Sequence, residues 1–103
     1  MIVEKTDTFD KWLKALKDEI GKAHILRRIQ RIETEGFFGD YKKLAGCELY
    51  ELIINFGPGY RVYFEKRSNN TIVFVLRGGK KADQKRDIKQ AKKLAVDYNL
   101  KEN

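Results

Sequence analysis

The sequence has little cysteine, histidine or proline, and each scarcity excludes a class of protein. Cys47 is the only cysteine among 103 residues, so no disulfide can form within the chain and no multi-cysteine zinc site is available. His24 is the only histidine, which excludes a paired-histidine acid–base mechanism and a histidine-rich metal cage. Pro58 is the only proline, and no proline-rich linker divides the chain. We expect a protein without a metal or other cofactor.

Long apolar runs are missing as well. No run of apolar residues exceeds six, far below the roughly 20 that cross a bilayer. No signal-peptide pattern opens the chain, so we expect a cytoplasmic protein that does not enter a membrane. Apolar residues make up 42% of the sequence, which is enough for one core of modest size. We therefore expect a single domain over residues 1–103.

Amphipathic helices are predicted near both ends of the chain. An extended start at Ile2–Val3 precedes a first helix, whose apolar residues recur at i, i+3, i+4 and i+7 over 9–16, after Thr6 as a capping residue. A second helix follows and ends at Gly36, which suits the left-handed position after a helix. Helical spacing returns over 83–101.

Three strands are predicted between these helices, because apolar residues alternate there with a period of two. They cover 49–56, 60–65 and 72–77, with turns at Gly57-Pro58-Gly59 and Ser68-Asn69-Asn70. The order strand–helix–helix–strand–strand–strand–helix predicts an α+β fold, in which a small antiparallel sheet has its helices packed on one face. The other face of the sheet is then at least partly open.

Positive charge is concentrated in two segments. The net charge is +7, from 22 Lys and Arg against 15 Asp and Glu. Residues 80–93 carry seven Lys and Arg against two Asp, and residues 22–31 carry four and no acid. Such surfaces beside a sheet suit a nucleic-acid phosphate backbone, although Lys-rich helices are as often only solvated faces. The candidate RNA contacts are Lys80, Lys85, Arg27, Arg28 and Arg31.

The middle of the chain resembles a known family. The segments Gly57-Pro58-Gly59-Tyr60-Arg61-Val62-Tyr63-Phe64 and Gly78-Gly79-Lys80-Lys81-Ala82-Asp83-Gln84, the latter followed by Asp87-Ile88, closely resemble the RelE/ParE toxin superfamily. They are similar above all to its HigB-like, phage-derived addiction module killer branch. The amino-terminal Phe9-x-x-Trp12-Leu13 fits the same pattern, so the likeness covers nearly the whole chain.

The resemblance implies a RelE-like fold and a type II toxin that a cognate antitoxin, commonly a helix-turn-helix protein, holds inactive. Most characterised relatives on the RelE and HigB side cut messenger RNA, often on the ribosome. ParE relatives instead poison DNA gyrase and lack the ribonuclease site. The resemblance thus implies messenger RNA and the ribosome as targets, with gyrase poisoning and an inactive antitoxin-binding member as alternatives. The chain departs from its branch at Ile53, where an arginine is common, and at Lys80, where an aspartate is frequent.

A metal-free mechanism can be assigned to residues of the predicted open face. RNA cleavage needs an acceptor for the 2′-hydroxyl proton, a cation for the phosphate and a donor for the leaving 5′-oxygen. Arg61 and Tyr63 lie two apart on one strand, so Arg61 can clamp the phosphate while Tyr63 stacks on a base or supplies a proton. Arg77 and Lys81 complete a cationic pocket, and Glu51 is the candidate base. The mechanism requires that no helix of the same chain covers these side chains.

Simpler interpretations of the same residues stay open. Arg61 and Glu51 can form a cross-strand ion pair, worth under about 1 kcal/mol when exposed. Tyr63 can pack as an edge aromatic. Gly78-Gly79 is expected to end the third strand as a turn, and Cys47 is expected in the core.

Overall fold

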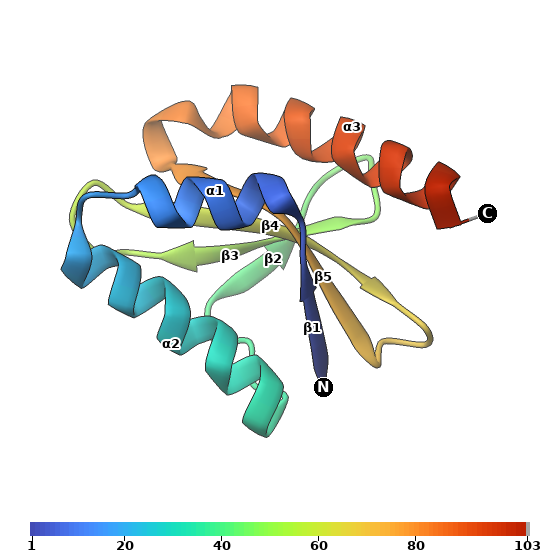
Figure 1. Cartoon of the computed structure of the whole chain (residues 1–103), viewed down its shortest axis with the longest axis horizontal. Helices are drawn as coiled ribbons and strands as arrows, with labels where there is room; N and C mark the ends of the chain where they lie inside the picture. The colour runs from blue at the N-terminus through green and yellow to red at the C-terminus, as the bar shows by residue number, and fades with distance from the viewer. Residues whose placement is uncertain (103) are drawn as a thin grey trace.

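The chain folds into a five-stranded sheet with helices on both of its faces (Figure 1). The structure, a computed structural model, describes residues 1–102, with side chains up to residue 99. The elements are β1 (Ile2–Lys5), α1 (Asp7–Ala15), α2 (Glu19–Glu35), β2 (Tyr41–Lys43), β3 (Leu49–Ile54), β4 (Tyr60–Arg67), β5 (Ile72–Lys80), a 3₁₀ turn (Lys81–Asp83) and α3 (Gln84–Glu102). Among the described residues, no helix is long and apolar enough to span a bilayer.

The sheet is mixed rather than wholly antiparallel. Its strand order is β1-β5-β4-β3-β2, and the strands from β2 to β5 pair antiparallel. At the far edge β1 runs parallel to β5, with Ile2 opposite Ile72 and Lys5 opposite Val75. Parallel neighbours need a long crossover, and most of the chain separates these two strands. The predicted antiparallel sheet is therefore corrected at both edges, since β1 is parallel and the short strand β2 was not predicted.

Helices α1 and α2 cover one face of the sheet with the larger core. Phe9 of α1 and three isoleucines of α2 pack on the alternate residues of β3, β4 and β5 that face them. Trp12 of α1 lies against Gly78, where a Cβ would come within 2.3 Å of the indole ring. Gly78 and Gly79 thus belong to β5 and were wrongly predicted to end it, because their missing side chains let other layers approach the strand backbone.

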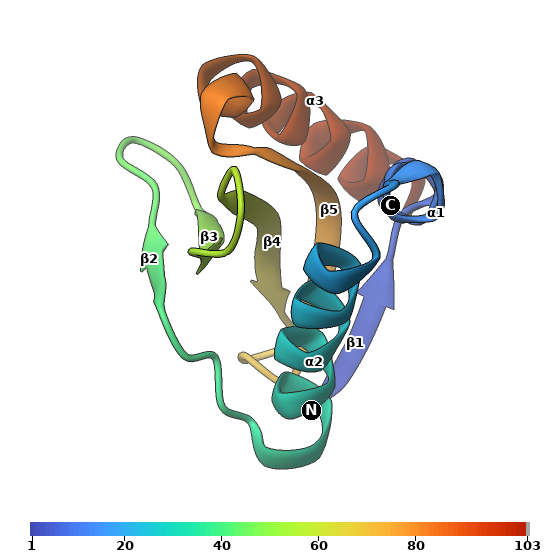
Figure 2. The same cartoon turned by 90° about the vertical axis from the view of Figure 1, so that its left-hand side faces the viewer.

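Helix α3 packs on the opposite face, as Figure 2 shows with α2 and α3 on either side of β5. Ala91 and Ala95 of α3 meet Tyr63, Phe74 and Leu76 in a second, smaller cluster. The prediction that all helices lie on one face is therefore wrong. The reason is visible in β4 and β5, whose apolar side chains point to both faces, so that each face needs a cover.

Local capping explains where the elements begin and end. The Thr6 hydroxyl accepts from the Phe9 N–H at 3.0 Å and donates to the Leu76 carbonyl at 2.5 Å, which joins the start of α1 to β5. Gly36 ends α2 with a φ of 65°. The predicted turn Ser68-Asn69-Asn70 is confirmed, since all three residues have positive φ.

Candidate functional site

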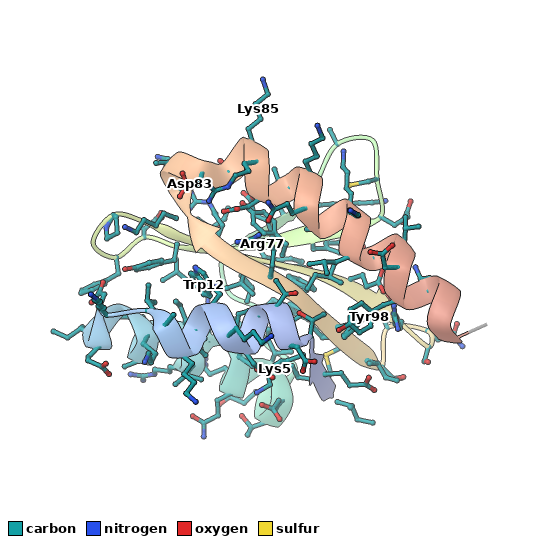
Figure 3. All side chains as sticks on the ribbon, turned by 45° about the horizontal axis from the view of Figure 1, so that its top comes forward. Lys5, Trp12, Arg77, Asp83, Lys85 and Tyr98 are labelled. Carbon is teal, nitrogen blue, oxygen red and sulfur yellow. The ribbon has the colours of Figure 1, made fainter. Side chains whose placement is uncertain are left out.

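Six polar side chains meet between the sheet and the first two turns of α3. We call them the buried polar cluster: Glu51 of β3, Arg61 and Tyr63 of β4, Arg77 of β5, and Gln84 and Asp87 of α3. The strand register aligns them, because Tyr63 lies opposite both Glu51 and Arg77 and residues in register share a face. Figure 3 shows Arg77 in the space between β5 and α3.

Glu51 is enclosed by donors. Its side chain is 1% exposed, and its Oε1 lies 3.6 Å from Nε of Arg61 and 3.8 Å from Nζ of Lys42. Its Oε2 accepts a hydrogen bond from Nε2 of Gln84 at 2.7 Å. The cross-strand ion pair of Glu51 and Arg61 thus exists, buried rather than exposed. With these partners Glu51 cannot reach a 2′-hydroxyl of RNA in this conformation.

Arg77 is likewise neutralised from α3. Its Nη2 lies 3.3 Å from Oδ1 of Asp87, whose side chain is fully buried. Its Nη1 donates to Oε1 of Gln90, and its Nε donates to the Gly78 carbonyl at 3.2 Å. Gly79 permits this approach, because a Cβ there would lie 1.8 Å from Oδ2 of Asp87. The guanidinium of Arg77 therefore holds α3 against the sheet.

Tyr63 lies at the centre with its hydroxyl unpartnered. Among the described residues neither this hydroxyl nor Nε of Arg61 nor Oδ2 of Asp87 has a hydrogen-bond partner. Burial raises the pKa of Tyr63 well above its ordinary value, with the charges of Glu51 and Asp87 acting in the same direction. The phenol is therefore neutral and can donate a hydrogen bond but not act as a base. Buried polar atoms without partners are rare, and a functional role is one explanation for them.

Of the three lysines at the end of β5 and the start of α3, Lys81 lies beside the cluster. Lys80 lies on the α1 side of the sheet, where it lines a pocket with Leu16 and Tyr60. Lys80, Lys81 and Lys85 are exposed, and no ion pair joins them to other described residues. The Lys81 N–H donates to the Gly59 carbonyl at 2.9 Å. A Cβ on Gly59 would lie 3.2 Å from Cβ of Lys81 and 3.9 Å from Nη1 of Arg61, so both cationic side chains flank this turn. Lys85 points away from the sheet (Figure 3).

The three arginines of α2 do not join the cluster, because α2 lies on the other face of the sheet. Arg28 donates to the carbonyls of Ile53, Phe38 and Asp40 at 2.7, 2.7 and 2.8 Å. Its guanidinium thus ties the loop after α2 to β3, and burial lowers its pKa. Arg27 and Arg31 are exposed. Of the three, Arg28 is structural in this conformation.

The prediction of an open sheet face is wrong at the predicted catalytic residues. Arg61 and Tyr63 are buried and Arg77 is half-buried, all beneath α3, whereas Lys81 is exposed. Two members of the cluster, Gln84 and Asp87, were given no role from the sequence. Both stand on the inner stripe of α3, one and two turns before Ala91. Polar residues on an otherwise apolar stripe were the signal that could have found them.

No group of three or more metal-binding side chains occurs among the described residues. The half-buried Cys47 packs against the smaller core cluster, as expected from the sequence.

Comparison with known proteins places the chain beside toxins in fold. No family model matches it. An uncharacterised protein of Haemophilus influenzae is 46% identical over 98 residues, covering 95% of this chain and 96% of that protein.

Solved structures of RelE proteins share the fold at low sequence identity. Free Escherichia coli RelE, as a double mutant, matches with a TM-score of 0.66 at 19% identity, over 89% of this chain and 94% of that one. The intact E. coli RelBE toxin–antitoxin complex matches with 0.61 at 18%, over 77% and 94%. The archaeal RelE–RelB complex of Pyrococcus horikoshii matches with 0.57 at 20%, over 77% and 92%. The predicted RelE-like α+β fold is thus confirmed.

Proposed function

We propose that this chain, which belongs to the same family as the Haemophilus influenzae protein, is the toxin of a type II toxin–antitoxin pair. The RelE fold carries the proposal, because the solved structures that share it include the E. coli toxin RelE, both free and in the RelBE toxin–antitoxin complex. A cognate antitoxin is the implied partner. Assignment to the HigB-like branch, with a helix-turn-helix antitoxin, is part of the same proposal and rests on the two sequence motifs.

We place messenger RNA on the ribosome as the target. Lys81 flanks the cluster without an ion pair to another described residue, and the exposed Lys80 and Lys85 add positive charge at this end of the sheet; we call the three the lysine rim, a charge suited to phosphates. Beneath this rim lie Arg61 and Tyr63, a phosphate-binding fork and a neutral phenol donor. These are two of the three groups that cleavage requires, with Glu51 as the proton acceptor.

The covering helix adds a condition to this mechanism. Arg61 and Tyr63 can touch RNA only when the first two turns of α3 leave the sheet, so the described conformation is the closed form. Opening breaks the hydrogen bond from Gln84 to Glu51 and the ion pair of Asp87 with Arg77. RNA phosphates entering under α3 would replace the Asp87 carboxylate on Arg77, which offsets part of the cost of opening.

The closed cluster is also the observation that favours a second candidate, a toxin that poisons DNA gyrase without enzymatic activity. Each cation of the cluster already has a carboxylate beside it, Glu51 for Arg61 and Asp87 for Arg77. A chain whose cluster never opens keeps these ion pairs as structure only. Its toxicity would then depend on surface contacts.

Brief induction of the chain in cells separates the two candidates. Under the proposal, primer extension on cellular messages finds new 5′ ends within codons, and plasmid supercoiling is unchanged. Supercoiling defects and DNA breaks without new 5′ ends would instead support gyrase as the target.

The variants for this test must fold. Arg61→Ala would take the buried cation away from the buried Glu51, which is destabilising. Arg61→Lys is the better change, because it keeps the charge and removes the planar fork. Combined with Lys81→Gln it should abolish message cleavage. Lys92→Gln on the outer side of α3 removes one exposed charge and should leave cleavage intact.

A further inference from the structure

A cleft of about 270 Å³ lies between α2 and the end of β3, on the opposite face of the sheet from the buried polar cluster. We call it the α2 cleft. Its walls combine four cationic or ionisable side chains with an amide and an aromatic ring: His24, Arg27, Arg28 and Arg31 from α2, and Ile54, Asn55 and Phe56 from the other side.

Positive charge lines the α2 cleft, and the acids that face it lie outside the lining: Glu35 on Arg31, Asp40 near Arg28 and Asp18 near His24. His24 and the three arginines follow i, i+3, i+4 and i+7 spacing along α2, so they share one stripe, and the arginines repel one another. None of the lining residues among the described part of the chain is acidic. Arg31 is paired with Glu35 at 3.3 Å, whereas Arg27 has no hydrogen bond or ion pair to another described residue. A bound anion would relieve this repulsion.

Arg28 holds the walls of the cleft in place and is not free to bind an anion. Its bonds to the Phe38, Asp40 and Ile53 carbonyls fix α2 against β3 and the loop before β2. The distance between the two walls is thereby set before any ligand enters, which lowers the entropy cost of binding. Arg27 remains available to hold an anion, and Arg31, one turn further along α2, can join it by exchanging Glu35 for the anion.

An aromatic pair stands beside these arginines. The imidazole of His24 stacks on the ring of Phe56 with centroids 4.4 Å apart and planes 25° from parallel. His24 is exposed and the neighbouring Asn55 is exposed as well. Aromatic faces next to cations are the arrangement with which proteins bind single-stranded nucleic acid. A volume of about 270 Å³ falls below the roughly 300–1,000 Å³ of small-molecule sites, so one sugar-phosphate unit fits better than a whole cofactor.

The cleft is continuous with the lysine rim of the cluster. The Phe56 carbonyl accepts from the Gly59 N–H at 2.9 Å, and the Gly59 carbonyl accepts from the Lys81 N–H at 2.9 Å. The turn over 56–59 therefore links the aromatic wall of the cleft to Lys81 around the same end of the sheet. A strand of RNA that contacts Lys81 can continue over this turn into the cleft.

We propose that the α2 cleft binds a phosphodiester unit of single-stranded RNA, with Arg27 and Arg31 on the phosphate and the His24–Phe56 pair against the sugar and base. This inference rests on the proposed function, because it extends the path of the message beyond the cluster. It assigns the cleft to RNA rather than to a carboxylate-rich segment of the antitoxin.

The test uses the full chain and a 2′-O-methyl RNA, which lacks the hydroxyl needed for cleavage. Binding is measured by fluorescence anisotropy over a range of salt concentrations. Arg27→Gln with Arg31→Gln should weaken binding about tenfold and lower the slope of log K against log salt by about 0.7 for each phosphate that the variant no longer neutralises. Lys92→Gln with Lys93→Gln removes the same charge from α3 on the other face and should change the slope by less. Equal effects of the two pairs would overturn the proposal, since only net charge would then act.

Two further measurements distinguish RNA from free phosphate and from the antitoxin as the ligand of the cleft. In NMR spectra the ring signals of His24 and Phe56 should shift with the RNA and only weakly with inorganic phosphate at the same phosphate concentration. Equal shifts would identify a free-phosphate site and overturn the proposal. So would a cleft variant that keeps RNA binding but no longer binds the antitoxin.

These results are independent of cleavage. A chain that binds the RNA through the cleft but cuts no message in cells refutes the proposed function and leaves the inference standing. A chain that cuts messages while its cleft variants bind RNA like the control pair refutes the inference alone.

Discussion

At the scale of single residues, two tyrosines on β4 differ in whether the buried hydroxyl has a hydrogen-bond partner. The Tyr60 hydroxyl donates to Oδ2 of Asp18 at 2.6 Å, whereas the buried Tyr63 hydroxyl has no partner among the described residues. A hydrogen bond normally offsets the loss of hydration when a hydroxyl is buried, and Tyr63 lacks that compensation. Burying the Tyr63 hydroxyl therefore lowers the stability of the fold.

Removing the two hydroxyls should have effects of opposite sign. Tyr63→Phe should raise the free energy of unfolding by about 1 kcal/mol, because it deletes an unsatisfied buried group. Tyr60→Phe should lower it, because Asp18 loses a donor. Urea unfolding of both variants measures the difference. If Tyr63→Phe also weakens growth arrest, the hydroxyl serves function at the expense of stability; a loss of stability in Tyr63→Phe would show that the hydroxyl has a partner.

The Asp18–Tyr60 hydrogen bond also predicts a pH dependence. Burial and the bond to Asp18 raise the pKa of Tyr60 from 10.0 to about 12. Because the folded-state pKa is the higher one, the stabilisation is complete below pH 10 and is lost as the pH rises through about 12. Wild type should thus lose stability more steeply than Tyr60→Phe in this window, as measured by the urea midpoint at a series of pH values. Parallel curves for the two proteins would refute the coupling.

The sequence alone could place the cluster residues on one face, but it could not show that the face is covered. Register and alternation put Glu51, Arg61, Tyr63 and Arg77 together, as the structure has them. Their pairing with Gln84 and Asp87 depends on which face α3 chooses, and that choice is set by packing across the whole sheet. The local pattern of β4 and β5 indicates that both faces need a cover, but it does not say which helix covers which face.

At the scale of elements, periodicity and capping residues predicted the helices and the central strands well. Thr6, Gly36 and the turn over 68–70 act as their residue types suggest. The short strand β2 escaped prediction because its three residues Tyr41–Lys43 are all exposed and show no alternation. Gly78-Gly79 was wrongly predicted to end β5, because glycine more often marks a turn than a place where a neighbouring helix packs close to a strand.

The cap at Thr6 should be worth more than an ordinary helix cap. Its hydroxyl satisfies both the Phe9 N–H and the buried Leu76 carbonyl, and Thr6→Val removes both bonds while keeping the shape. We expect a decrease of about 2 kcal/mol in the free energy of unfolding. Thr34→Val on the exposed side of α2 is the matched control and should change stability by less than about 0.5 kcal/mol. Equal effects would mean that the link between α1 and β5 contributes nothing.

At the scale of the whole molecule, the helices on the two faces of the sheet are held by apolar cores of different size. Among the described side chains, eleven buried residues form the core under α1 and α2, whereas seven form the one under α3. To those seven α3 contributes two alanines, with Ile88, Leu94 and Tyr98 only partly buried beside them. Less apolar area is therefore buried under α3, and polar contacts at its start make up part of the difference. A layer held in this way is expected to open before the rest of the fold.

Hydrogen exchange should show this order directly. Amides of α3 should exchange by openings of lower free energy than those of α2, and Gln84→Ala should lower the protection over 84–90 further. If closure limits access to Arg61, the same variant should cut messages faster than wild type. Uniform protection of α2 and α3 would contradict an opening of α3 that precedes global unfolding. Gln90→Ala, further along α3, removes the acceptor of Arg77. It should lower the protection over 84–90 as much as Gln84→Ala does if the two contacts hold the helix equally.

The closest approach between helix and sheet occurs where β5 has no side chain at all. Because Gly79 has no side chain, the carboxylate of Asp87 lies against the backbone of β5. A methyl group at this position would clash with that carboxylate and force α3 away from the strand. A Gly79→Ala substitution would therefore displace the start of α3 from β5 and expose the polar side chains beneath it.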